Sequence, residues 1–426
     1  MNTQDFRKLI NRGLGSAILF LKENQNRNRK YLRAIQFACT NNTAYDPQVE
    51  GSRAEYLWEA IQFSGFSEYL QEAVLTALLA STQPYDIEQM LHLSRRFAEN
   101  GNNTAKEIMY KTFQYNERWN TFIGADDLIL LDGTHGLLYV TDVIGRKIIS
   151  DNYYEDDWIL SIAEEELGKD NVHLCLSEAS QTNPNVKAYI DSVDNFREKE
   201  APLTKDKIKT YEEIKLQIDD INDKTSNHWY SYWGAHATEE DFLKAAHDFL
   251  AEDIKHKKLK YLYIFGRKQF PLNIDKIIDL AYSKDKALSF EAIWVLKKIQ
   301  NEQVHELAVS LWNKNPRNYF IIKLIEKNYH DTDYRILEEI LFQKHHKYAF
   351  HDLGMSILKI FEENLSSNCF DLLVRIYNLT WCSNCRRRAL EIMIKNKIAP
   401  DWILKECKFD SNPDTRELIN INLMLT

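Results

Sequence analysis

The spacing Cys382-x-x-Cys385 is the sequence feature with the clearest chemical potential. Two thiolates at this spacing can hold zinc, or can alternate between dithiol and disulfide when a helix N-terminus lowers the pKa of the first thiol. A structural zinc needs four ligands, but the chain has no second Cys-x-x-Cys and no Cys-x-x-His, and Cys407 is the nearest third thiol. We therefore interpret Cys382 and Cys385 as buried or half-buried cysteines at a helix start. A metal site that includes Cys407 and a redox role are the alternatives.

Three histidines, His345, His346 and His351, offer a second set of potential metal ligands. No His-Glu-x-x-His pattern accompanies them, and adjacent residues on a helix point to different sides. We interpret this segment as a solvated turn between helices.

Four ionisable residues near two glycines are the nearest approach to an acid–base site: Asp126, Asp127, Asp132 and His135. Apolar runs on either side favour an ordinary helix–turn–helix in this region. We interpret the carboxylates as helix-start residues that complement the helix dipole, and we assign no catalytic residue.

Aromatic and basic residues provide the candidates for partner binding. Trp229, Tyr230, Tyr232 and Trp233 could stack on nucleobases, although an aromatic cap over a helical core is the favoured interpretation. Residues 255–268 contain six Lys or Arg and no acid. A basic groove would attract an acidic partner, whereas solvated helix faces are the simpler explanation of such runs. The partner-binding candidates are Lys255, Lys257, Lys258, Arg267, Lys268, Arg386, Arg387, Arg388, Trp229 and Trp233.

The elements that must position these residues are predicted to be helices. The chain has only 13 glycines and 8 prolines among 426 residues, although a sheet-rich fold needs many turns made from these two residue types. Apolar residues recur at intervals of three and four, as in residues 54–61, 70–78, 304–311 and 389–394. Comparable segments repeat about every 30 to 35 residues in the C-terminal half, which is typical of stacked helix pairs. The predicted fold is all-α, a HEAT-like α-solenoid of antiparallel helix pairs.

Three regions are predicted along the chain. Residues 1–194 form an N-terminal helical array, and residues 228–426 form a C-terminal array of HEAT-like repeats. The charged segment 195–227 between them keeps apolar residues at helical spacing, so we expect a long solvated helix. A flexible linker is the alternative.

The C-terminal half resembles HEAT-repeat proteins. The resemblance rests on residues 270–272, 279–281, 292–296 and 304–308, on Asn328-Tyr329 and Tyr377-Asn378, and on residues 382–386, 406–407, 410–412 and 416–417. Together these are similar to poorly characterised bacterial HEAT-repeat-containing proteins, over about residues 228–426. Residues 45–46, 50–54 and 131–138 extend the similarity into the first half. The resemblance implies an α-solenoid that binds partners and provides no catalytic residues to transfer.

Bulk properties narrow the classes of function. The formal net charge of −9 disfavours broad, non-specific nucleic-acid binding. The apolar stretch 14–21 is too short for a membrane span, so we expect a cytoplasmic protein without a membrane partner. The leading hypothesis is a non-enzymatic scaffold, without a cofactor, that binds a protein partner on its concave face. The alternatives are a nucleic-acid-binding protein resembling the HEAT-like DNA glycosylases, and a zinc or redox role at Cys382 and Cys385.

Overall fold

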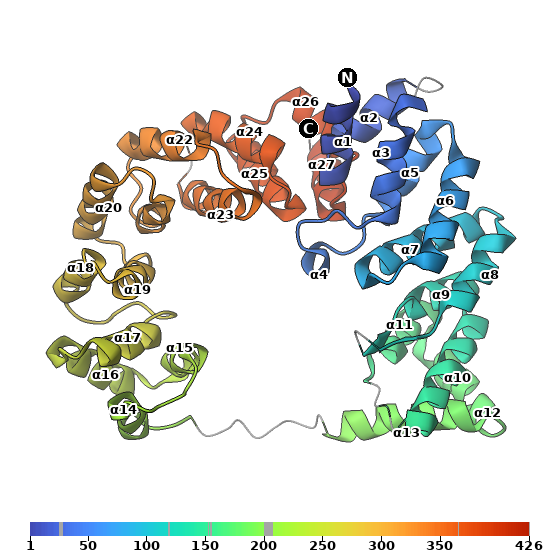
Figure 1. The fold of residues 1–426 in the computed structure, drawn as a ribbon, viewed down its shortest axis with the longest axis horizontal. Helices are drawn as coiled ribbons and strands as arrows, with labels where there is room; N and C mark the ends of the chain where they lie inside the picture. The colour runs from blue at the N-terminus through green and yellow to red at the C-terminus, as the bar shows by residue number, and fades with distance from the viewer. Residues whose placement is uncertain are drawn as a thin grey trace. The chain divides into compact units, whose positions relative to one another are not determined.

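The protein is all-α, as the sequence predicts. A computed structural model describes residues 1–24, 29–117, 120–151, 153, 156–199, 208–364 and 366–425. These residues contain 27 α-helices and one short antiparallel ribbon, in which β1 (Tyr115–Asn116) pairs with β2 (Thr121–Phe122) (Figure 1). Among the described helices, none is both long enough and apolar enough to cross a membrane.

Contacts divide the chain into two compact units. The first contains Met1–Leu203, Trp381–Arg387 and Pro400–Thr426, and the second contains Thr204–Thr380 and Arg388–Ala399. The sequence assigned all of residues 228–426 to a C-terminal array. The contacts instead place the last segment of the chain with the N-terminal helices.

The first unit is built from short and medium helices in chain order. Their bounds are α1 (Thr3–Arg12), α2 (Gly15–Glu23), α3 (Leu32–Thr40), α4 (Pro47–Glu50), α5 (Ala54–Ser64), α6 (Ser67–Ala80), α7 (Pro84–Glu99), α8 (Asn103–Thr112), α9 (Ala125–Asp132), α10 (Thr134–Asp151), α11 (Trp158–Leu167), α12 (Lys169–Ser180), α13 (Pro184–Lys199), α26 (Asp401–Cys407) and α27 (Pro413–Leu425), with the 3-10 turn η1 (Arg29–Tyr31). One continuous apolar core runs through this unit from Phe6 to Val193.

The second unit contains the remaining helices. Their bounds are α14 (Tyr211–Asp219), α15 (Asn227–His236), α16 (Glu239–Ala251), α17 (Lys255–Ile264), α18 (Asp275–Ala281), α19 (Lys286–Leu296), α20 (Glu302–Lys314), α21 (Ile322–Ile325), α22 (Tyr334–Phe342), α23 (Lys347–Glu363), α24 (Phe370–Leu379) and α25 (Ser383–Lys395), with η2 (Tyr319–Ile321), η3 (Asp331–Asp333) and η4 (Ser367–Cys369). The first turn of α25 belongs to the first unit.

Alternate helices of the second unit pack against one another. Contacts join α15 to α17, α17 to α19, α19 to α21 and α21 to α23. Each of α17, α19, α21 and α23 also contacts the helix that precedes it in the chain. Figure 1 shows α18, α20 and α22 along one side of this unit and α19 and α23 along the other.

The expectation of one long helix over residues 195–227 is wrong. Helix α13 ends at Lys199, and α14 begins at Tyr211, after described residues that are not helical. The reason is a capping box, in which the Thr210 hydroxyl accepts from the Glu213 N–H and the Glu213 carboxylate accepts from the Thr210 N–H at 2.8 Å. Residues 200–207 of the expected helix lie outside the described residues.

Helix α14 is also less solvated than predicted. Tyr211, Ile214 and Ile218 are buried in the second unit. The Tyr211 hydroxyl donates to the Asp248 carboxylate at 2.6 Å, which fixes α14 against α16.

The two ends of the chain meet in the first unit around a buried ion pair. The Arg386 side chain is fully buried, and its Nε and Nη2 donate to the two carboxylate oxygens of Asp410 at 3.0 and 3.1 Å. Nη2 also lies 3.2 Å from the carbonyl oxygen of Gly13, between α1 and α2. Taking these charges out of water costs free energy that only well-placed hydrogen bonds can offset. Arg386 therefore couples the last segment of the chain to its first helices.

A second buried carboxylate reinforces this junction. Glu50 accepts from the Ser383 hydroxyl at 2.6 Å, from the Ser383 N–H at 3.0 Å and from Arg53 at 3.2 Å. Burial by itself would raise the pKa of Glu50, but Arg53 and the Ser383 hydrogen bonds outweigh it and lower that pKa. Helices α2 and α26 also approach each other closely at Gly15. A Cβ at this position would lie only 1.8 Å from the Glu406 carbonyl oxygen, so the close approach requires glycine.

Replacing Asp410 by alanine tests how much this junction contributes. Asp410→Ala leaves the Arg386 guanidinium buried without its counter-ion, so we expect the free energy of unfolding to fall by about 3–5 kcal/mol. Urea denaturation followed by tryptophan fluorescence measures the change, and hydrogen exchange in α26 and α27 localises it.

The matched control is Lys405→Ala, which breaks an exposed ion pair of 3.5 Å with Glu23 in the same unit. We expect it to change the free energy of unfolding by no more than about 1 kcal/mol. Equal unfolding midpoints for Asp410→Ala and Lys405→Ala would contradict the role assigned to the buried pair.

Candidate partner-binding surface

The basic run 255–268 is largely neutralised inside the second unit. Lys255 forms an ion pair with Asp285, Lys257 Nζ lies 2.7 Å from an Asp219 carboxylate oxygen, and Lys258 Nζ lies 3.4 Å from Asp253. Asp219 and Asp285 come from other segments of the chain and Asp253 directly precedes the run, so the run is basic in sequence but compensated in space.

The last two cations of this run behave differently from one another. Lys268 Nζ donates to the Ala237 carbonyl oxygen at 2.9 Å and lies 5.4 Å from the Phe242 ring centroid. Arg267 is exposed, and within the described part of the chain no acidic residue pairs with it. Arg267 is therefore the member of the run that is available to a partner.

The three consecutive arginines have three different environments. Arg386 is buried in the ion pair with Asp410, and the Arg387 Nε lies 3.8 Å from the Asp414 carboxylate. Arg388 forms a two-pronged ion pair with Glu362, at 2.6 and 2.8 Å. Because Arg386 is buried, it is not accessible to a partner. Its role is to hold the first unit together.

The aromatic segment 229–233 divides between core and surface. Trp233 is fully buried and its Nε1 donates to the Lys209 carbonyl oxygen at 2.7 Å, so this side chain does not face a partner. Tyr230 is also buried. Trp229 is half-buried and stacks on the exposed Tyr232 with 5.6 Å between ring centroids. The segment is mainly a packing element, with Trp229 at its edge.

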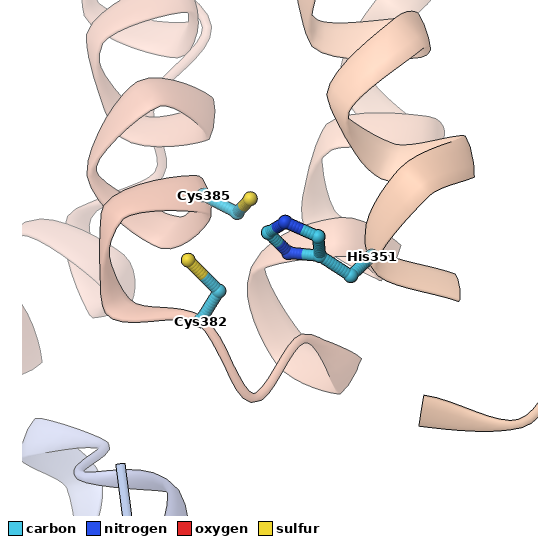
Figure 2. Close-up of side chains that lie close together, drawn as sticks. All are labelled: His351, Cys382 and Cys385. Atoms are coloured by element: carbon cyan, nitrogen blue, oxygen red, sulfur yellow. The ribbon is translucent and has the colours of Figure 1, made fainter. Parts of the chain in front are cut away.

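The cysteine pair lies at the start of α25. Figure 2 shows Cys385 on the first turn of the helix and Cys382 on the chain just before it. Cys382, Cys385 and Cys407 are all buried, with 6%, 1% and 0% of their surface exposed. The interpretation of Cys382 and Cys385 as buried helix-start cysteines is confirmed.

The histidines of the segment 345–351 act locally in the second unit. His345 Nε2 lies 2.7 Å from the Ile340 carbonyl oxygen, and His346 caps α23 by accepting from the Ala349 N–H at 3.3 Å. His345 and His346 lie in the turn between α22 and α23, as predicted, and His351, labelled in Figure 2, lies on α23 itself.

The acidic residues between 126 and 135 form two separate clusters in the first unit. Asp132 accepts from Lys106 and from the Tyr110 hydroxyl, both at 2.6 Å. Asp127 pairs with Arg95 at 2.9 Å and lies 3.4 Å from His92. The two clusters are separate: Asp126 and Asp127 both face His92, whereas Asp132 lies 3.8 Å from His135.

Burial and neighbouring charges shift the pKa values of the groups in the Asp127 cluster. Burial raises the pKa of Asp127 to about 7. Burial would lower the pKa of His92, but Asp126 and Asp127 outweigh it and raise that pKa to about 9. As predicted, Asp126 and Asp127 lie in the first turn of α9, where carboxylates complement the helix dipole.

A surface that the sequence did not predict lies on α19 and its neighbours. The rings of Phe290, Trp294 and Phe320 are nearly parallel, with interplanar angles of 8 to 15°. The centroids of Phe290 and Phe320 are 4.3 Å apart, and Phe290 is 46% exposed. Phe290 and Trp294 are four residues apart on one helix face, and Phe320 comes from η2. Local capping positions both elements, because Asp285 caps α19 and Asn318 caps η2.

Two lysines complete this surface at the C-terminal end of α19. Lys297 Nζ lies 3.4 Å from the Trp294 ring centroid, a close cation–π contact. Lys298 Nζ is buried, and no hydrogen-bond partner for it exists in the described part of the chain. We call Arg267, Phe290, Trp294, Lys297, Lys298, Phe320 and Lys359 together the aromatic–lysine surface.

The charge around Lys298 is only partly balanced. Burial, together with the neighbouring cations Lys297, Lys359 and Arg267, lowers the pKa of Lys298 to about 8. The buried Glu326 carboxylate contacts Lys359 at 3.0 Å and Lys323 at 3.5 Å, so its negative charge is already paired with these two lysines. The surface consequently has a surplus of positive charge beside three stacked rings.

The signal for this surface in the sequence was the spacing of Phe290, Trp294 and Lys298 at intervals of four. Sequence reasoning missed it because aromatic residues at helical spacing usually belong to the core. Phe320, 26 positions away from Trp294, completes the stack, and that contact exists only in the folded unit.

The titration of Lys298 provides a direct test of this electrostatic environment. An unfolded lysine has a pKa of about 10.4, so between about pH 8 and that value the unfolded chain binds more protons and stability rises with pH. After reductive ¹³C-methylation we expect one lysine resonance with a midpoint near pH 8, lost in Lys298→Arg. Removing a neighbouring cation with Arg267→Ala should raise that midpoint. A Lys298 resonance that titrates near its unfolded value would contradict the assignment.

Comparison with known proteins gives no family for this chain. No protein-family model matches it, and no curated protein matches it.

Proposed function

We propose that this chain is a non-enzymatic scaffold of HEAT-like repeats that binds a protein partner through the aromatic–lysine surface of its second unit. The observation that carries the proposal is the stack of Phe290, Trp294 and Phe320 with Lys297 over the Trp294 ring, next to Lys298, whose buried Nζ has no hydrogen-bond partner among the described residues. A partner carboxylate on the neighbouring surface would stabilise the charge of Lys298 by Coulomb attraction without contacting its buried Nζ.

The packing of the second unit supports the solenoid part of the proposal. Alternate helices from α15 to α23 contact one another in sequence, and each of α17, α19, α21 and α23 also contacts the helix before it in the chain. In a solenoid, such stacking buries the face that one helix pair cannot bury alone, and the inner helices form the concave binding face. On this interpretation α19 is an inner helix and presents Phe290 and Trp294 to the partner.

The composition of the surface suits a protein partner with an acidic segment. Tryptophan and arginine dominate the binding energy of protein interfaces, and aromatic anchors surrounded by charge set affinity and orientation. Trp294 and Phe290 would hold an apolar or aromatic side chain of the partner. Lys297 and Arg267 would hold its carboxylates. The mechanism is geometric and includes no bond-making step.

Nucleic acid is the second candidate, and one observation favours it. Rings within 15° of parallel, bordered by lysines, resemble the stacking platforms that bind single-stranded nucleic acid. Glu326 and Asp352 beside the lysines, together with a net charge of −9, weaken attraction to a phosphate chain. We therefore place a carboxylate-bearing protein first.

The test is an affinity purification from the native cell with wild type, Trp294→Ala and Lys298→Gln, followed by reconstitution with the purified partner. We expect each variant to weaken the reconstituted complex by about 30-fold, because a central aromatic or charged anchor contributes about 2 kcal/mol. The matched control is Trp158→Ala, which removes a tryptophan that is 55% exposed on the first unit. It should leave the dissociation constant unchanged.

Two outcomes decide against the proposal. Retention on a single-stranded oligonucleotide with a steep salt dependence, lost in Trp294→Ala, would assign the surface to nucleic acid. A protein partner that binds Trp294→Ala and Lys298→Gln as tightly as wild type would show that the partner docks elsewhere.

A further inference from the structure

A second site in the same unit has the chemistry of a metal centre. Glu302 and His305 lie in the first turn of α20, three residues apart and on one face of the helix. His330 comes from the loop that precedes η3. Their ligand atoms lie within 4.8 Å of one another.

The distances within this group match those between ligands of one ion. The Glu302 carboxylate oxygens lie 3.5 Å from His305 Nδ1 and 3.6 Å from His330 Nε2. These separations are longer than hydrogen bonds. Two ligands bound at about 2.0–2.1 Å to a tetrahedral zinc ion are roughly 3.3 Å apart. The His305 and His330 rings are stacked, with 3.8 Å between centroids and 30° between planes, so metal binding requires the exposed His330 ring to rotate out of this stack.

Asp333 orients the central histidine. Both of its carboxylate oxygens lie 3.0 Å from His305 Nε2, so this nitrogen carries the proton and donates to Asp333. In the neutral ring, His305 Nδ1 then holds its lone pair toward the Glu302 carboxylate. A metal cation bound between Nδ1 and the carboxylate would satisfy both groups, as would a second proton on the His305 ring. A carboxylate behind a ligating histidine is the usual second partner in zinc sites.

The same carboxylate also positions the loop that carries His330. Asp333 Oδ2 accepts from the His330 N–H at 2.8 Å. Asn328 fixes the other side of this loop, because its Oδ1 accepts from the Asn301 N–H at 2.8 Å and its Nδ2 donates to the Ile299 carbonyl oxygen at 2.9 Å. The loop is therefore tied to the start of α20, where Glu302 and His305 lie.

From this geometry we propose that Glu302, His305 and His330 bind a divalent transition-metal ion, with Zn²⁺ preferred. Two imidazoles and one carboxylate suit zinc better than the oxygen-only ligands that calcium and magnesium select. The three protein ligands leave a fourth position for water or a partner group. His305 is buried, whereas Glu302 and His330 are exposed at the mouth of the site, so an ion can enter from solvent.

The proposal is tested by titrating zinc chloride into the full chain after it has been stripped of metal with a chelator. Calorimetry should show one site, and the thermal unfolding midpoint should rise with zinc. His330→Gln and Glu302→Gln should each weaken zinc binding by at least about tenfold, without changing the far-UV circular dichroism. The matched control is His247→Gln, an exposed histidine of α16 in the same unit, which should leave binding unchanged.

Cobalt substitution separates this site from the cysteines. Cobalt bound by nitrogen and oxygen should show visible d–d bands without the near-ultraviolet thiolate-to-cobalt band, and these d–d bands should disappear in His330→Gln. Asp333→Asn, a change to a positioning residue, should weaken zinc binding by about 10- to 100-fold while leaving the ligands in place.

Two results would overturn the proposal. If the metal-free protein binds no zinc stoichiometrically, His305 is an imidazolium held between Asp333 and Glu302 in a purely structural ion cluster. If His330→Gln and Glu302→Gln bind zinc as tightly as wild type, or if the cobalt spectrum shows thiolate ligation alone, the ion binds elsewhere.

Discussion

The first unit depends on one buried ion pair. A guanidinium with no exposed surface is stable only where hydrogen bonds replace its water, and Arg386 obtains them from Asp410 and from the Gly13 carbonyl oxygen. These groups come from the beginning and the end of the chain. The contact therefore fixes more than one side chain. It also holds the C-terminal helices in this unit, so that α26 and α27 pack with α1 and α2 rather than continue the second unit. Glu50, which binds Ser383 and Arg53, strengthens the same junction.

Charge compensation, rather than charge count, decides which residues of the second unit can face a partner. The run 255–268 is strongly basic by sequence, yet Asp219 and Asp285 from two other segments and Asp253, directly before the run, neutralise it. Lys298 has no such partner among the described residues, because Glu326 is already occupied by Lys323 and Lys359. A surplus of charge then coincides with stacked aromatic rings. This coincidence distinguishes the surface from an ordinary solvated helix face.

The turns of the second unit use buried polar side chains as organisers. Asn328 and Asp333 satisfy backbone groups at the start of α20 and in the loop before η3. Because Asp333 binds both the His305 ring and the His330 backbone, a carboxylate needed for turn geometry also brings two imidazoles together. Structural and chemical roles thus meet in the same residue. The aromatic–lysine surface and this histidine group lie on different elements of the unit and are independent of one another.

The sequence by itself determined the fold class and the helical character of most segments. Helical spacing, scarce glycine and proline, and local caps act over a few residues, and the all-α fold and the helix-start position of Cys382 and Cys385 followed from them. A capping box at Thr210 and Glu213 was also visible in the sequence, but the apolar spacing around it led to the prediction of one long helix. Only the tertiary structure decided which charges are compensated, which aromatics are exposed, and which histidine faces His305. The decisive contacts join residues separated by 25 to several hundred positions, such as the His305 and His330 rings or the Arg386 guanidinium and the Gly13 carbonyl oxygen. Periodicity carries no information about such pairs, because their approach results from how the helices pack.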